Sequence, residues 1–127
     1  MRRLTQILGL IVVFMVVALA IDYARVRAKE DRVFHAIAQY GGRCGSIPFW
    51  PIGAEYRITF FRTLTSDELD QLDELNSLRG TVNVAFADCD LSPDQVREAT
   101  ARLDNCKLFR VIDGEIFALI CGTPATP

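Results

Sequence analysis

The feature that most constrains this chain is an uncharged, apolar stretch near its N-terminus. No charged residue occurs between Arg3 and Asp22, and residues 10–17 are apolar at every position. A helix rises about 1.5 Å per residue, so about 20 residues cross a hydrocarbon core about 30 Å thick. A half-exposed helix of a soluble protein would keep one polar face, and this stretch has none. We therefore expect residues 1–23 to form a transmembrane anchor, with Tyr23 at the membrane interface.

The same segment also has the features of a cleaved signal peptide. Arg2 and Arg3 form a basic N-terminal region, and residues 18–20 (Ala-Leu-Ala) have the small-x-small form of a cleavage site. The apolar core is long for a signal peptide, and helix-forming sequence follows it, which favours the anchor. Two basic residues precede the span, and four follow it by residue 32. By the positive-inside rule, this difference slightly favours a cytoplasmic location for the soluble domain.

Residues 24–42 have the pattern of an amphipathic helix beside the membrane. Apolar residues recur at helical spacing, with charged residues on the other faces; they are Val26, Val33, Ile37 and Tyr40. Gly41 and Gly42 are expected to end this helix, because glycine adopts the left-handed conformation at little cost. No glycine or proline occurs between residues 10 and 40, so we expect the anchor to continue into this helix without a linker.

The composition argues against several classes of function. Of the 127 residues, fewer than about 100 remain for a soluble domain, which is small for an enclosed active site with its own supporting shell. The net charge of −2 provides no basic field for nucleic acid. No glycine-rich phosphate loop is present. We therefore expect no enzyme, no cofactor, no nucleic-acid partner and no small-molecule ligand.

The residues that could carry catalysis or bind metal are isolated from one another in the sequence. His35 is the only histidine, and on a charged helix it is expected to be a surface residue. The acidic cluster is expected to be the solvated face of one helix; it comprises Asp67, Glu68, Asp70, Asp73 and Glu74. The four cysteines show no CxxC spacing, so free thiols are expected, with a disulfide as the alternative; they are Cys44, Cys89, Cys106 and Cys121.

The chain contains an internal repeat of helix-starting sequence. Residues 64–69 (LTSDEL) and 91–96 (LSPDQV) share one pattern about 27 residues apart. Thr65 and Ser92 are the expected N-caps, and Pro93 suits the first helical position. Apolar residues at helical spacing follow each start; they are Leu69, Leu72, Leu75 and Leu78, then Val96, Ala99 and Leu103.

Strand-like alternation precedes each of these helices. It occurs at Ile58-x-Phe60 and at Val84-x-Phe86, and a third strand is expected over residues 109–116. Residues 84–91 extend the second strand to the pattern LxLxxCxL, and this motif resembles a leucine-rich repeat. The resemblance covers residues 56–117, and with the anchor it is similar to short membrane-anchored repeat proteins of bacteria. A β-α-β-α-β unit of an unrelated α/β domain remains the alternative.

The resemblance implies an α/β fold class: a transmembrane helix followed by a short strand-helix stack with a small parallel sheet. The repeat-like domain would cover residues 43–121, and residues 122–127 would be a disordered tail. Residues 43–57 are expected to be an irregular loop or a short strand, because their prolines exclude a central strand. Phe49 and Trp50 are expected to cap one end of the stack, with residues 117–121 at the other end; an exposed contact site is the alternative for Phe49 and Trp50.

In the leucine-rich-repeat family, the concave face of the strand ladder usually binds partner proteins. The corresponding residues here are those that alternate with the buried ones; they are Arg57, Thr59, Phe61, Asn83, Ala85, Ala87, Leu108, Arg110 and Ile112. The sequence therefore predicts a single-pass membrane protein with a protein-interaction or scaffolding role. The alternative is a small membrane-tethered α/β redox protein that uses the thiol of Cys44 or Cys89.

Overall fold

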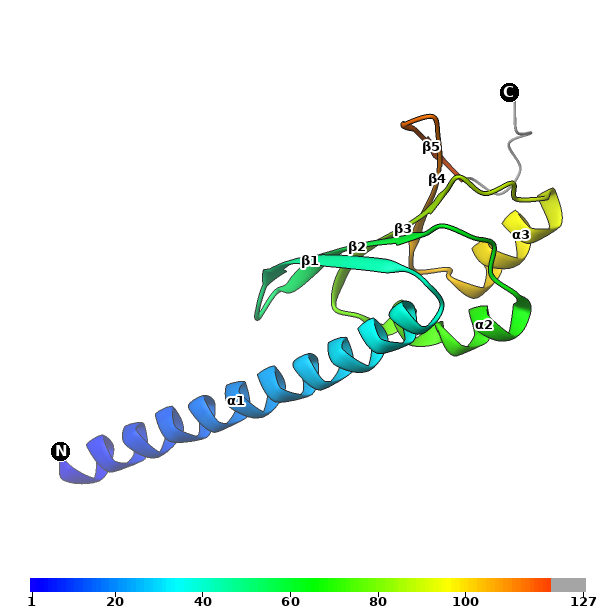
Figure 1. The fold of residues 1–127 in the computed structure, drawn as a ribbon. Helices are drawn as coiled ribbons and strands as arrows, with labels where there is room; N and C mark the ends of the chain where they lie inside the picture. Colours follow the sequence, from blue (N-terminus) through cyan, green and yellow to red (C-terminus); the bar gives the residue numbers. More distant parts are fainter. Residues whose placement is uncertain (120–127) are drawn as a thin grey trace.

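The structure, a computed structural model, describes residues 1–119. One long helix leads into a five-stranded sheet that carries all the helices on one face (Figure 1). The elements in chain order are α1 (Arg2–Gln39), β1 (Arg43–Phe49), β2 (Gly53–Phe60), α2 (Ser66–Gln71), the 3-10 helix η1 (Asp73–Ser77), β3 (Gly80–Ala87), α3 (Pro93–Arg102), β4 (Lys107–Ile112) and β5 (Glu115–Ala118). The chain is therefore mixed α/β with a long N-terminal helix.

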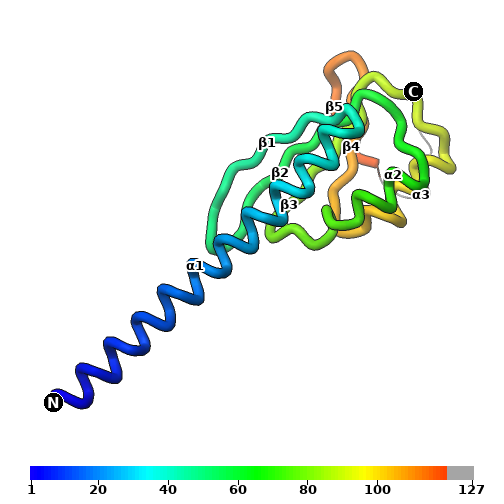
Figure 2. The backbone as a smooth tube through the Cα atoms, turned by 60° about the horizontal axis from the view of Figure 1, so that its bottom comes forward, coloured from blue at the N-terminus to red at the C-terminus, as the bar shows by residue number. Residues whose placement is uncertain are grey.

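Helix α1 has two halves with different surroundings. Residues 1–21 are all exposed and project away from the rest of the molecule (Figure 2). In the C-terminal half, Val33 and Ile37 are buried against the sheet. The helix ends at Tyr40, and Gly41 follows with φ +76°. The expected continuous helix and its glycine termination are confirmed, and no break separates residues 1–23 from the amphipathic residues that follow.

The sheet has the order β1-β2-β3-β4-β5, and its three central strands run parallel. Ile58 of β2 lies opposite Val84 of β3 in the parallel register, so the predicted pairing of these two strands is confirmed. Both edge strands run antiparallel to their neighbours, which makes the sheet mixed rather than parallel. A short connection permits only a hairpin, because a parallel neighbour needs a long crossover. Residues 50–52 and 113–114 are such connections.

Both short helices begin at the predicted caps. The Thr65 hydroxyl accepts a hydrogen bond from the backbone N–H of Glu68, whose carboxylate accepts one from Thr65 N. Ser92 and Gln95 form the same capping box at the start of α3, with Pro93 at the first helical position. These reciprocal bonds satisfy backbone donors that have no partner within the helix.

The hydrophobic core lies between one face of the sheet and the helices. Tyr56, Ile58 and Phe60 of β2 are at most 1% exposed. The predicted helical leucines are buried beneath them; they are Leu69, Leu72, Leu75 and Leu78. Alternation along the strands directs the remaining side chains to the opposite face, on which no further layer packs within residues 1–119. We call this second surface the open face.

The residues expected to cap the two ends of the core, Phe49 with Trp50 and residues 117–121, do not close it in the described part of the structure. Residues 43–49 form edge strand β1, which accommodates Pro48 because an edge position has one unpaired side. Phe49 is 59% exposed and Trp50 is 37% exposed at the hairpin turn, so neither closes the core. At the other end Phe117 is 46% exposed, and only Leu119 packs against the core. Residues 120–127, which include the rest of that cap, Cys121 and the expected tail, lie outside the described residues.

Candidate functional site

The site that the sequence did not reveal is the junction between α1 and the β1–β2 hairpin. The Asp22 carboxylate on α1 accepts two hydrogen bonds of 2.8 Å from the guanidinium of Arg79, which lies just before β3. The same guanidinium donates a hydrogen bond of 3.3 Å to the backbone oxygen of Pro51 in the hairpin turn. One arginine therefore holds together the first charged residue after the apolar stretch, the hairpin turn and the start of a central strand.

An aromatic pair lies beside this ion pair. The rings of Tyr23 on α1 and Trp50 in the hairpin turn meet edge to face, with 5.4 Å between their centroids. Such pairs add to the energy of burial because the edge of one ring meets the face of the other. Both rings and Arg79 line a cavity of about 150 Å³ between α1 and the hairpin; the remaining lining residues are Val26, Arg27, Glu30, Pro48, Gly53, Ala54 and Tyr56.

Glu30 is the one buried charged residue within residues 1–119, with 6% of its surface exposed. The Tyr56 hydroxyl donates a hydrogen bond of 2.6 Å to its Oε1, and Arg27 contacts its Oε2 at 3.3 Å. A buried carboxylate needs such partners to offset its lost hydration. Burial and the neighbouring carboxylate raise the pKa of Tyr56 well above its usual value.

The contacts of the junction join α1 to the hairpin turn and to the start of β3. Among the residues that line the cavity, the ionisable groups are arginine, glutamate and tyrosine. The arginines stay protonated, and the raised pKa of Tyr56 keeps its hydroxyl neutral near pH 7. The arrangement can therefore fix α1 to the hairpin and to β3, and we call it the clasp (Asp22, Tyr23, Glu30, Trp50, Tyr56 and Arg79).

The open face includes most of the residues predicted as a contact surface. The strand register places five of them on this side of the sheet; they are Arg57, Thr59, Asn83, Ala85 and Ala87, of which Ala87 is buried at 7% exposure. Phe61 follows β2 and is 48% exposed, with the guanidinium of Arg43 stacked 5.4 Å from its ring centroid. Arg43 lies opposite Thr59, so this pair extends the open face to the edge strand.

The prediction for the third strand was wrong in two respects: residues 109–116 contribute to two antiparallel strands, β4 and β5, and the residues assigned to the contact face of β4 are displaced by one. Leu108 lies opposite Val84 and is 5% exposed, so it belongs to the core. Arg110 and Ile112 share its side of β4, whereas Phe109 and Val111 lie opposite Ala85 and Ala87 on the open face. A register change of one residue moves every side chain of a strand to the other face. Residues 108–112 carry apolar side chains on both faces, so alternation alone did not determine which face is buried.

The actual third strand gives the open face a larger apolar area than expected. Phe109 and Val111 are partly buried there, beside Ala118 and Ile116 of β5. Ile116 is 69% exposed. The other polar residues of this face include Glu55, which pairs with Arg57 at 3.0 Å, and Lys107. The open face thus combines an apolar area over β3, β4 and β5 with three basic residues (Arg43, Arg57 and Lys107) and one acidic residue.

Arg110 lies instead near the end of the helix-covered side. Its guanidinium contacts Asp90 at 3.3 Å, while its Nε is buried without a hydrogen-bond partner among the described residues. In the sheet, Arg110 lies opposite Phe86 of β3 on one side and Phe117 of β5 on the other. These surroundings make Arg110 a contact of the turn after β3 rather than of the open face.

The three described cysteines, Cys44, Cys89 and Cys106, are free thiols. Burial raises the pKa of Cys44 and, with help from Asp88, that of Cys89. Burial raises the pKa of Cys106 to about 11. A reactive thiol needs a lowered pKa, because the thiolate is the nucleophile.

His35 lies on the surface as expected, whereas the acidic cluster, expected on one helix, is divided between α2 and the 3-10 helix η1. His35 is exposed on α1, as are Asp67 and Asp73 on the helices that follow β2. The Glu68 carboxylate accepts a hydrogen bond from Thr65 N in the capping box and pairs with the guanidinium of Arg62 at 2.7 Å. Within the described part of the chain, no three histidine, cysteine or carboxylate side chains converge as metal ligands would.

Comparison with known proteins adds no relative to this description: no protein-family model, no curated protein and no solved structure matches the chain.

Proposed function

We propose that this chain is a single-pass membrane protein whose small α/β domain is held close to the bilayer and binds a partner protein through its open face. The proposal rests on the exposed, apolar N-terminal half of α1. Its residues 1–21 are exposed, and its residues 4–21 are uncharged. The same helix then continues without a break into the core of the domain. An apolar helix that its own domain leaves bare is suited to lipid.

The continuity of α1 favours a retained anchor over a cleaved signal peptide. The candidate cleavage site at residues 18–20 lies inside the helix. Two residues later the clasp begins with the Asp22–Arg79 pair. Retention of residues 1–20 would keep α1 continuous from its apolar half into the Asp22–Arg79 pair.

The open face has the composition of a protein-binding surface. Its apolar centre carries Phe109, Val111 and Ile116, and its basic residues outnumber the single Glu55 although the whole chain has a net charge of −2. Interfaces place apolar and aromatic residues centrally and polar groups around them. We therefore propose a partner that presents an apolar patch bordered by acidic side chains. The resemblance to leucine-rich repeats assigned a contact role to the same side of β2 and β3, although not of β4.

A photo-crosslinking amino acid at two matched positions tests this proposal in intact cells. Position 85 lies on the open face, and position 97 lies on the exposed side of α3. We expect one discrete protein adduct from position 85, none from position 97, and loss of the adduct when Phe109→Asp is added. Equal adducts from both positions, or an adduct insensitive to Phe109→Asp in a folded protein, would refute binding by the open face.

The alternative function, a thiol-dependent redox protein, finds little support in the site. The raised pKa values of Cys44, Cys89 and Cys106 keep these thiols protonated near pH 7.

A further inference from the structure

The tip of the β1–β2 hairpin, residues 47–52, is apolar and exposed. Ile47 is 44% exposed, Phe49 is 59% exposed and Ile52 is 87% exposed. No charged residue occurs between Arg43 and Glu55. An exposed apolar patch of this kind on a small domain marks a surface that binds something apolar.

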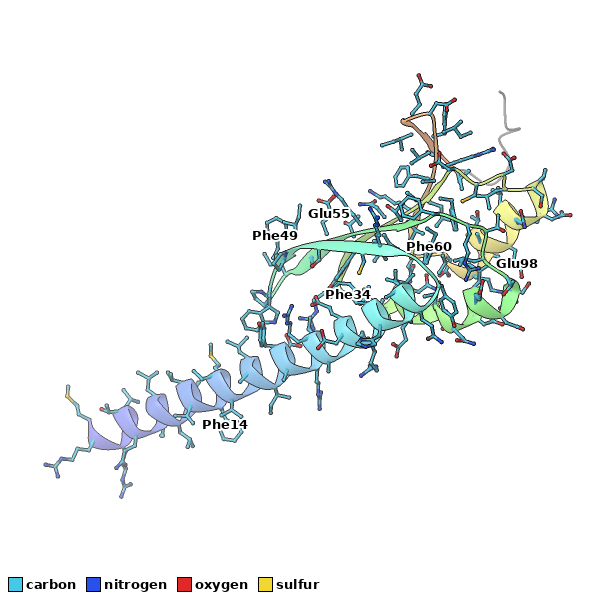
Figure 3. The ribbon with its side chains drawn as sticks, viewed as in Figure 1. Phe14, Phe34, Phe49, Glu55, Phe60 and Glu98 are labelled. Carbon is cyan, nitrogen blue, oxygen red and sulfur yellow. The ribbon has the colours of Figure 1, made fainter. Side chains whose placement is uncertain are left out.

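The position of the tip is fixed relative to the apolar half of α1. The hairpin points toward the N-terminal half of α1, with Phe49 at its end (Figure 3). Trp50 contacts Tyr23, which lies two residues after Ile21, the last residue of the uncharged stretch. Two residues correspond to about 3 Å along a helix. The interfacial layer on each side of the hydrocarbon core is about 5–8 Å thick.

We propose that residues 47–52 insert into the interfacial layer of the same bilayer that α1 crosses, beside the point where α1 leaves it. This inference rests on the proposed membrane anchor. The hairpin and α1 then form one membrane-contact surface, with the Tyr23–Trp50 pair at the height of the lipid headgroups.

Lipid is the occupant that the chemistry of the tip favours. Tryptophan and tyrosine concentrate at membrane interfaces because their rings are apolar and their polar groups reach water. Two exposed arginines of α1, Arg25 and Arg27, come shortly after Tyr23, where they could contact anionic lipid headgroups. The anchor also holds the tip at a high effective concentration next to the bilayer, so insertion requires little further loss of freedom.

The chain has one tryptophan, so the fluorescence of Trp50 reports on the tip alone. The full chain is reconstituted into phosphatidylcholine vesicles that carry bromine at a shallow or a deep acyl position, or none. We expect strong quenching by the shallow bromine and weaker quenching by the deep one. We expect Phe49→Asp and Ile52→Asp each to reduce the quenching and to shift the emission to longer wavelength. Ile116→Asp is the matched control, because Ile116 is 69% exposed in the other hairpin.

Three results would overturn the inference. The first is the same Trp50 emission in brominated and plain vesicles. The second is unchanged quenching in both Asp variants of the tip. The third is a change of oligomeric state in those variants without a change in quenching, which would assign the tip to a second copy of the chain. Vesicle flotation separates these from failure of the anchor: a chain that does not float with the vesicles refutes the anchor itself, whereas a floating chain with unquenched Trp50 refutes only the insertion of the tip.

Discussion

The Asp22 carboxylate on α1 and the Arg79 guanidinium before β3 are joined by two parallel hydrogen bonds, although 57 residues separate them in the chain. Asp22 is the first charged residue after the apolar stretch. The bidentate geometry fixes orientation as well as distance, because two parallel bonds resist rotation. The domain is therefore fastened to α1 at the level where the helix would leave a membrane.

We expect Arg79→Ala to loosen α1 from the domain while the fold persists. The ion pair is partly exposed, so its contribution to stability is small, but Arg79 also holds the hairpin turn through Pro51. Hydrogen exchange of the α1 amides from residue 22 to residue 30 should become faster. Arg57→Ala, which removes only the pair with Glu55 on the open face, should leave it unchanged. Equal exchange in Arg79→Ala and the parent would contradict a fastening role.

Tyr56→Phe is expected to lower the free energy of unfolding by about 1–3 kcal/mol, because it leaves one oxygen of buried Glu30 without its hydroxyl donor. Urea denaturation at pH 7 measures this loss. Tyr23→Phe is the control, since its ring contact with Trp50 is retained. A loss no larger than that of Tyr23→Phe would show that the hydrogen bond to Glu30 contributes little.

The same variant should change the dependence of stability on alkaline pH. The pKa of Tyr56 is higher in the folded than in the unfolded chain, where it is about 10. Its contribution to stability is therefore complete below pH about 10 and is lost as the pH rises above that value. Denaturation midpoints between pH 9 and pH 11 should fall more steeply in the parent chain than in Tyr56→Phe. Parallel profiles would contradict the raised pKa.

In acid, Glu68 is expected to contribute the opposite dependence. The hydrogen bond from Arg62, followed by that from the Thr65 backbone, lowers the pKa of Glu68 from 4.5 to about 2. A lowered folded pKa gives stability that is present above the unfolded pKa and is lost as the pH falls through the folded pKa. Glu68→Gln should therefore flatten part of the stability loss between pH 4.5 and pH 2. An unaltered acid profile in Glu68→Gln would exclude this linkage.

Gly80→Ala is expected to destabilise the fold by about 2–4 kcal/mol. Gly80 has φ +124°, and a Cβ there would lie 1.9 Å from the backbone oxygen of Ala54 on the neighbouring strand. Backbone cannot move aside as a flexible side chain can. Gly45→Ala is the matched control in β1, because nothing lies within 4 Å of its added Cβ. Similar thermal midpoints for the two variants would contradict the close contact of β2 and β3.

Thiol labelling of the folded chain separates the interaction role from the redox alternative. Of the three cysteines among residues 1–119, we expect Cys44 to react first because it is exposed, but more slowly than a free cysteine at pH 7, since its pKa is raised. Cys89 is buried and partly buried Cys106 has a pKa of about 11, so both should react more slowly than Cys44 until the chain unfolds. Rapid labelling of Cys44 or Cys89 at pH 6 would instead indicate a stabilised thiolate and restore the redox alternative.

Local signals in the sequence predicted much of the fold. The caps at Thr65 and Ser92 and the parallel pairing of Ile58 with Val84 followed from hydroxyl placement and alternation, which act within one element or between similar ones. The register of β4 could not be predicted in this way, because residues 108–112 place apolar side chains on each face of the strand. Only tertiary packing selects Leu108 for the core.

The clasp could not be predicted from the sequence for a different reason. Its contacts join Asp22 to Arg79, Tyr23 to Trp50 and Glu30 to Tyr56 across long stretches of chain. No periodicity connects such distant residues. The one available signal was the apolar group of Phe49 and Trp50 between two prolines, which is typical of a turn as well as of a cap.

The central claim is that α1 stays attached and crosses a membrane. Alkaline extraction of cell membranes, followed by intact mass measurement of the extracted and retained chain, tests it most directly. We predict that the chain remains in the membrane pellet and that its mass includes residues 4–21. A chain released into the alkaline supernatant, or one that begins just after Ala20, would contradict the account.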